Sequence, residues 1–153
     1  MADNAKLIEQ LYAAMNRHDG EAMANLYDPN GRFHDPAFGE LTGAEAGDMW
    51  RMLTGRATDL KVELAEHEAN GDEGSAHWIA TYTFSTGRPV VNDIHARFRF
   101  REGRIVEHDD SFSFFRWARQ ALGPAGFVLG LPPMNLLVRR RARRDLAEFR
   151  GES

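Results

Sequence analysis

The chain has 153 residues, of which 42% are hydrophobic and 27% charged, a size and composition that predict one water-soluble domain with a substantial core. It has no cysteine, which excludes disulfides, thiolate catalysis and cysteine-based zinc sites and fits a reducing compartment. The net charge is −4, but residues 139–153 hold six arginines against three acids (+3), so the other residues carry −7, and a body this acidic does not attract nucleic acid.

The chain begins with a polar segment, residues 1–6, that lacks the apolar region of a signal peptide. Nor does the sequence contain a run of about 18 apolar residues, the length that a membrane-spanning helix needs. We therefore expect a cytoplasmic location. The spacing of apolar residues predicts a helix over 3–17, which Asp3 or Asn4 can cap. Its apolar face comprises Leu7, Ile8, Leu11, Tyr12 and Met15.

A second, short helix is predicted at about 20–27, followed by a turn at 29–31, a short strand at 32–35 and a helix at 44–55. Four strands with alternating apolar residues then follow, at 59–69, 75–86, 90–101 and 104–114, and glycine-containing turns join the last three. Beyond them the sequence predicts a helix at 113–122, an apolar segment at 127–131 and a basic helix at 134–149, which begins after Pro132-Pro133.

This order of helices first and antiparallel strands afterwards predicts an α+β domain. We expect a curved antiparallel sheet wrapped by the N-terminal helices into a cone, with a single deep apolar cavity of the kind that binds small molecules. Residues 1–115 form this predicted domain, and residues 116–153 form a C-terminal helical extension packed on it or on a partner.

The segment 31–43, Gly-Arg-Phe-His-Asp-Pro-Ala-Phe-Gly-Glu-Leu-Thr-Gly, holds Asp35 between an apolar strand and a proline-containing turn. Together with the order of elements, it resembles the cystatin-like fold of the nuclear transport factor 2-like superfamily, and within it the ketosteroid isomerase and SnoaL-like polyketide cyclase branch. In ketosteroid isomerases the general base is the Asp of a Glu-Asp-Pro-Val-Gly segment that ends in Ser-Gly. Residues 34–39, His-Asp-Pro-Ala-Phe-Gly, match that segment with one added residue, and Thr42-Gly43 matches its end.

A second match lies in the first helix, where ketosteroid isomerases carry a Tyr in a Tyr-Val-Ala-Ala-like setting that donates to the substrate oxyanion. Residues 12–16, Tyr-Ala-Ala-Met-Asn, match it. The resemblance therefore implies that Asp35 is a base and Tyr12 an oxyanion donor. The chain departs from the pattern at the second oxyanion donor, a protonated Asp in the family. Aligning residues 97–100, Arg-Phe-Arg-Phe, with the corresponding strand end puts Ala96 in its place.

The last strand offers a replacement, because side chains two residues apart share a face. If Phe112 faces the cavity, so do Asp110 and His108, and SnoaL-like cyclases place an acid/base Asp near this end of the sheet. Burial raises the pKa of a carboxyl group, and the charges of two neighbouring carboxyl groups separate their pKa values. One of the two groups can then take a proton while the other gives one. We predict catalytic roles for Tyr12, Asp35, His108 and Asp110, and a ligand pocket lined by Trp50, Trp78, Phe84, Phe98 and Phe112.

The leading hypothesis is a cofactor-independent isomerase or cyclase that acts on an apolar carbonyl compound through an enolate. One alternative is a non-catalytic protein that binds a lipophilic ligand, and another is a hydrolase resembling limonene epoxide hydrolases, which use Asp–Arg–Asp around a water. Asp35 and Asp110 match the carboxylates, but no Arg matches by motif. Each site residue also has a structural interpretation: Tyr12 as a core residue, Asp35 as a turn former, and residues 108–110 as a solvated strand end.

His34, Asp35 and His108 are residue types that suit zinc or iron, but no close pair such as His-x-x-x-His supports a site, so we assign no metal and no cofactor. The superfamily implies a homodimer that packs through the outer face of the sheet, and this explains the arginine-rich face of strand 90–101. The basic run 139–144 is interpreted as a solvated helix face, with membrane contact and nucleic-acid binding less favoured. The residues expected to pack beneath it are Leu136, Leu137, Val138, Leu146 and Phe149.

Overall fold

The computed structural model describes residues 3–151, so Met1 and Ala2 of the polar N-terminal segment and Glu152 of the basic tail lie outside the described residues. The helices α1 (Asn4–Asn16) and α2 (Gly20–Ala24) come first, and α3 (Gly43–Arg56) follows the first two strands. The six strands form one curved sheet in the order β2-β1-β6-β5-β4-β3. They are β1 (Tyr27–Asp35), β2 (Gly39–Thr42), β3 (Lys61–Asn70), β4 (Glu73–Thr83), β5 (Pro89–Arg101) and β6 (Arg104–Ser111).

Local signals in the sequence set the helix ends. Asp3 caps α1 by accepting from the backbone N–H groups of Ala5 and Lys6. Thr42 and Glu45 form a reciprocal capping box at the start of α3. At the other end of α1, the Asn16 side chain donates to the Val62 carbonyl and accepts from its N–H, which fastens the helix to the outermost strand β3. Helix α1 therefore has a capped N-terminus and a C-terminus that is tied to the sheet.

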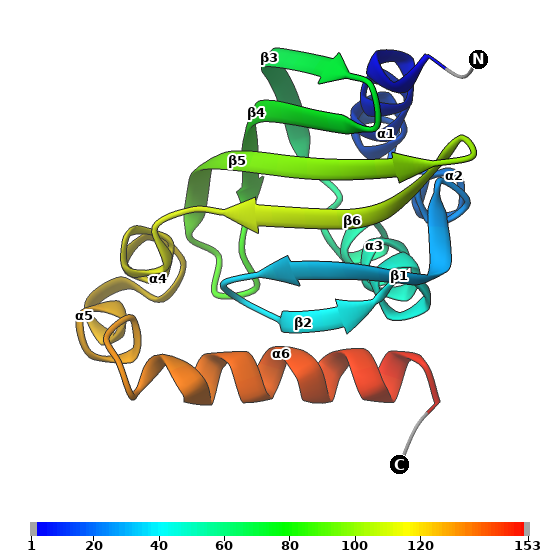
Figure 1. The fold of residues 1–153 in the computed structure, drawn as a ribbon. Coiled ribbons are helices and arrows are strands. Elements are labelled where there is room, and N and C mark those ends of the chain that lie inside the picture. Colours follow the sequence, from blue (N-terminus) through cyan, green and yellow to red (C-terminus); the bar gives the residue numbers. More distant parts are fainter. Residues whose placement is uncertain (1–2, 152–153) are drawn as a thin grey trace.

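The predicted α+β fold is confirmed, and alternation along β5 shows how the sheet divides inside from outside. Every second residue from Val90 to Phe100 is buried, and those between are exposed. The helices α1, α2 and α3 lie against one face of the sheet (Figure 1), and their side chains pack with those of this inner face in one large apolar cluster. All strand pairs are antiparallel except β1 and β6, which run parallel. This pair joins the β1–β2 hairpin to the strands that follow α3.

Three local predictions differ from the structure. The turn expected at 29–31 lies inside β1, where it forms an irregularity in the pairing with β6. The helix expected at 20–27 ends at Ala24, so Tyr27 is the first residue of β1. Strand β2 was not predicted, because four residues are too few to show alternation.

The outer face of the sheet is polar and carries two hollows, of about 520 and 1060 Å³. Arg97, Arg99 and Glu107 line the first, and His67, His77 and His95 line the second. Tyr12, Asp35 and Asp110 line neither. The deep apolar cavity on the inner face therefore stays a prediction. The homodimer through the outer face also stays a prediction.

The C-terminal extension contains the helices α4 (Phe114–Leu122), α5 (Gly126–Leu129) and α6 (Asn135–Phe149) and a short 3₁₀ turn. Helix α6 runs along the edge strand β2 (Figure 1), where Arg143 donates to the carbonyls of Phe38 and Glu40 and Leu146 joins the main core. Such a cover protects an exposed sheet edge from pairing with other chains.

The packing predicted beneath the basic run is correct for Leu146, which is buried, and wrong for three other residues. Leu136, Leu137 and Phe149 lie on the exposed side of α6, because the arginine side chains and not these residues turn toward the β1–β2 hairpin.

No helix within residues 3–151 is long and apolar enough to cross a membrane.

Candidate active site

Strand β6 places two polar side chains in the core. His108 and Asp110 are 1% and 3% exposed, and they share the inner face because they are two residues apart. Asp109 between them points to the outer face, where it pairs with His34. On the neighbouring strand, Phe98 lies opposite His108 and Ala96 lies opposite Asp110. Asp110 thus lies beside Ala96, the position where ketosteroid isomerases would carry their second oxyanion donor.

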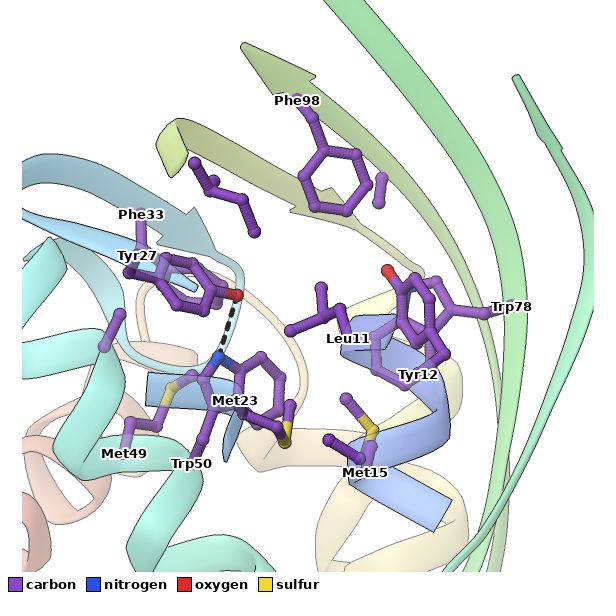
Figure 2. Packing of buried hydrophobic residues seen from close by; sticks show 14 of the residues in the cluster. Leu11, Tyr12, Met15, Met23, Tyr27, Phe33, Met49, Trp50, Trp78 and Phe98 are labelled. Carbon is purple, nitrogen blue, oxygen red and sulfur yellow. Dashed lines mark hydrogen bonds between the residues drawn. The ribbon is translucent and has the colours of Figure 1, made fainter. Parts of the chain in front are cut away.

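A chain of buried hydrogen bonds ends at Asp110. The indole N–H of Trp50 donates to the Tyr27 hydroxyl over 2.9 Å, which Figure 2 shows as a dashed line. The hydroxyl lies 2.7 Å from His108 Nδ1, and His108 Nε2 lies 2.8 Å from Asp110 Oδ1. With the His108 proton on Nε2, every donor in the chain has an acceptor: Tyr27 donates to Nδ1 and Nε2 donates to the carboxylate. This arrangement fixes the orientation of the imidazole and of the Asp110 carboxylate.

Asp35 is held differently, by the turn that joins β1 to β2. Its Oδ1 accepts from the N–H groups of Ala37 and Phe38, at 2.9 and 2.6 Å. Burial raises the pKa of Asp35 from an ordinary 3.8 to about 7, the charge of Asp110 adds to the rise, and the two backbone bonds oppose it. A carboxyl group with this pKa takes and releases a proton near neutral pH, as a general base must.

Two donors on the inner face have no protein partner. The Tyr12 hydroxyl and the Trp78 indole N–H are buried without a hydrogen bond. The centroids of their rings lie 5.0 Å apart, and Figure 2 shows the two rings side by side on the inner face. Burial, followed by the charges of Asp110 and Tyr27, raises the pKa of Tyr12 well above its ordinary value, which keeps its hydroxyl protonated. Buried donors of this kind are rarely left unpaired unless a water or a ligand completes them.

These groups lie within one electrostatic neighbourhood. Burial raises the pKa of Asp35, Tyr12 and Tyr27, and the charge of Asp110 adds to the rise in each, although these residues come from α1 and from opposite ends of β1. Small side chains surround Asp110, because Ala76, Ala96 and Asp110 are direct neighbours across β4, β5 and β6. The inner face therefore combines two carboxyl groups, an imidazole and two donors without a protein partner, with small side chains beside Asp110.

The raised pKa of Asp35 predicts a pH-dependent stability. The folded chain holds this proton up to about pH 7, whereas the unfolded chain releases it near 3.8, so folding loses stability as the pH rises between these values. The free energy of unfolding of Asp35→Asn, minus that of the unchanged chain, should grow by a few kcal/mol over this interval and level off above about pH 7. Urea denaturation at several pH values measures it. A difference that is constant or shrinks with pH would contradict the burial of a neutral carboxyl group.

Not every predicted residue joins the site. Trp50 and Phe98 pack around His108, Trp78 packs on Tyr12, and Phe112 packs against both core clusters. Phe84 packs edge-on against Trp117 of α4, in the second cluster. The considered metal set does not converge, because His34 lies on the outer face while Asp35 and His108 are buried. No arginine is buried within residues 3–151, so the Asp–Arg–Asp set of epoxide hydrolases has no central member here.

Two site residues escaped the sequence analysis. Tyr27 was assigned to a helix, and only its place at the start of β1 brings it to His108. Tyr82 of β4 accepts from the Trp117 indole N–H, and burial, with a smaller contribution from the charge of Asp35, raises the pKa of its hydroxyl. Alternation along β4 places Tyr82 on the face of Trp78, but no sequence signal links it to Asp35.

The extension reaches the same turn that holds Asp35. Arg139 donates to the carbonyl of Pro36, and Arg143 to those of Phe38 and Glu40. Farther along, Arg150 binds Asp48 and Glu45 of α3. The backbone that positions the buried carboxyl group is thereby fastened to α6.

Comparisons with known proteins agree with the fold. The sequence model of the SnoaL-like domain family matches residues 8–108. No curated protein sequence matches the chain significantly. Among solved structures, a Catenulispora acidiphila protein with a ketosteroid isomerase-like fold, in complex with trimethylamine, is similar at 21% identity and a TM-score of 0.69, covering 80% of this chain and 96% of that one.

Two further structures are similar. IdmH of Streptomyces antibioticus, a candidate polyketide cyclase, aligns at 23% identity and a TM-score of 0.64, over 78% of this chain and 98% of its own. An epoxide hydrolase of M. tuberculosis that resembles limonene epoxide hydrolase aligns at 17% identity and a TM-score of 0.66, over 82% of this chain and 92% of its own. At these identities the likeness shows the shared fold.

Proposed function

The chain belongs to the SnoaL-like domain family of the nuclear transport factor 2-like superfamily, and from that premise we propose that it is a cofactor-independent acid/base enzyme for an apolar carbonyl compound. The observation that carries the proposal is the pairing of Asp35, a buried carboxyl group with a pKa of about 7, with two buried donors that have no protein partner. The resemblance of the fold to that of IdmH, a candidate polyketide cyclase, supports this class of substrate.

The proposed reaction begins when Asp35, as carboxylate, takes a proton from the carbon next to the substrate carbonyl. The electron pair of the broken C–H bond moves into an enolate, whose oxygen accepts hydrogen bonds from Tyr12 and Trp78. The Asp35 carboxyl group then gives this proton to another carbon in an isomerisation, or to the new alkoxide in an intramolecular aldol closure, and is again a carboxylate. In this proposal His108 positions Asp110, whose charge adds to the burial that raises the pKa of Asp35.

Exchange of α-protons tests the first step without knowledge of the natural substrate. We expect the protein to accelerate deuterium incorporation into 2-tetralone, a small apolar ketone, in D₂O, as followed by NMR. Tyr12→Phe should slow this exchange by about a hundredfold to a thousandfold, the loss typical when one oxyanion donor is removed and another, here Trp78, remains. Phe leaves the ring packing against Trp78 in place, so the fold should be retained.

Binding without turnover is the alternative function, and the unpaired donors alone also favour it. We would measure it with 2-naphthol, a planar phenol that imitates an enolate, by its fluorescence. Tight naphthol binding that Tyr12→Phe weakens, with no tetralone exchange by the unchanged chain, would replace the enzyme proposal by that of a ligand-binding protein. If the protein neither binds naphthol nor exchanges tetralone, both are wrong for this ligand class.

A further inference from the structure

A second cluster of chemistry-bearing side chains lies on the opposite face of the sheet. His77 of β4 and His95 of β5 are direct cross-strand partners, and Asp93 shares their face because it is two residues before His95. The two imidazole rings stack 4.4 Å apart at 8°. The cluster contains none of the proposed catalytic residues, and the reaction proposed above does not use it.

The distances suit a shared ion. His77 Nε2 lies 2.6 Å from Asp93 Oδ1, and His95 Nε2 lies 3.9 Å from the same oxygen. One ligand atom from each residue falls within 4.8 Å of the others. Ligands bound tetrahedrally to zinc at about 2.0–2.1 Å are roughly 3.3 Å apart. On binding an ion, the distance from His77 Nε2 to Asp93 Oδ1 would lengthen and the distance from His95 Nε2 to the same oxygen would shorten. The side chains of His77, Asp93 and His95 are 28%, 54% and 69% exposed, so they are free to make this adjustment.

We propose that His77, Asp93 and His95 bind a divalent transition-metal ion of the zinc type. Two imidazole nitrogens and one carboxylate oxygen form a donor set that such ions favour over magnesium or calcium, which prefer oxygen ligands. Three protein ligands leave a fourth position, as in zinc sites that also bind water or substrate. That position faces the hollow of about 1060 Å³ that His77 and His95 line, so a water or a small anion has access to it.

The test is a calorimetric titration of the chelator-treated full chain with zinc chloride. We expect saturable binding that His95→Ala and Asp93→Asn each weaken by at least about tenfold, the lower end of the loss seen when a residue that merely orients a ligand is removed. Cobalt(II) provides a second readout, because a tetrahedral site with nitrogen ligands gives intense visible absorption, which the same variants should abolish. Circular dichroism confirms that these exposed substitutions leave the fold intact.

His34→Ala is the matched control, since His34 is another exposed histidine of the outer face and is also paired with a carboxylate, Asp109. It should bind zinc as the unchanged chain does. The proposal is overturned if the unchanged chain shows no saturable binding, if His95→Ala binds equally well, or if His34→Ala loses as much affinity. In each case the cluster is a surface hydrogen bond between His77 and Asp93 with the His95 ring stacked on that of His77.

Discussion

Asp35→Asn should slow the exchange of tetralone α-protons by between about 10² and 10⁴, the range that a positioned general base contributes. The substitution removes the basic oxygen but keeps the size and shape of the side chain. Its amide oxygen can still accept from the N–H groups of Ala37 and Phe38, so the turn should keep its conformation. The exchange rate of the unchanged chain should rise with pH and reach a plateau above about pH 7, because only the ionised form of Asp35 accepts a proton.

Asp109→Asn is the control for this experiment. It makes the same chemical change next to Asp110, on the outer face of β6 in a solvent-exposed position, and should leave the exchange rate unchanged. If Asp35→Asn retains the full rate, Asp35 is not the base. The Asp35→Asn variant should also be more stable than the unchanged chain above about pH 7, because it has no buried carboxylate that must be charged in the folded state. Lost exchange together with gained stability would show that the folded chain tolerates an unfavourable carboxylate at this position.

Gly43→Ala should destabilise the fold by about 3 kcal/mol or more, the upper range for overpacking a tight contact. Gly43 is the first residue of α3, and a Cβ there would overlap the carbonyl oxygen of Asp28 and approach its carbon to 2.9 Å. Both atoms belong to the backbone of the β1 irregularity, so no side chain can rotate away. The free energy of unfolding, measured in urea with the slope of the transition compared, reports the loss.

Gly55→Ala is a matched control on the same helix. A Cβ at Gly55 meets nothing within 4 Å, so only helix propensity acts, and the change should be neutral or stabilise by up to about 1 kcal/mol. Equal effects at the two positions would mean that β1 and the start of α3 are not in close contact. A loss at Gly43 alone would show that the bulge in β1 and the helix that carries Trp50 are positioned by one another.

Much of the fold follows from patterns within single segments. Alternation along β5 identified its buried face residue by residue, and the same rule placed His108 and Asp110 together inside. The Asp-Pro turn identified Asp35, because a carboxyl group two or three residues before free N–H groups binds them locally. These inferences succeed because each depends on residues that are near one another in the sequence.

What the sequence did not indicate depends on contacts between distant segments. Tyr27 reaches His108 only because β1 pairs with β6, a parallel pairing that local propensity does not encode. Trp78 was expected to be part of a pocket wall, and its role as an unpaired donor emerges only from its surroundings. The pair of His77 and His95 required the register between β4 and β5, and the docking of α6 on the Asp35 turn required the position of the arginine side chains.

The parallel pairing of β1 with β6 also bears on the order of events as the chain leaves the ribosome. β1 is synthesised early, but its partner strand comes last among the strands, and α6, which fastens the Asp35 turn, comes later still. Domains synthesised from the N-terminus cannot complete such long-range contacts until the distant segment has emerged. Until β6 and α6 have been synthesised, we expect Asp35 to be an ordinary solvated carboxylate, and its pKa to rise only when these segments complete its burial.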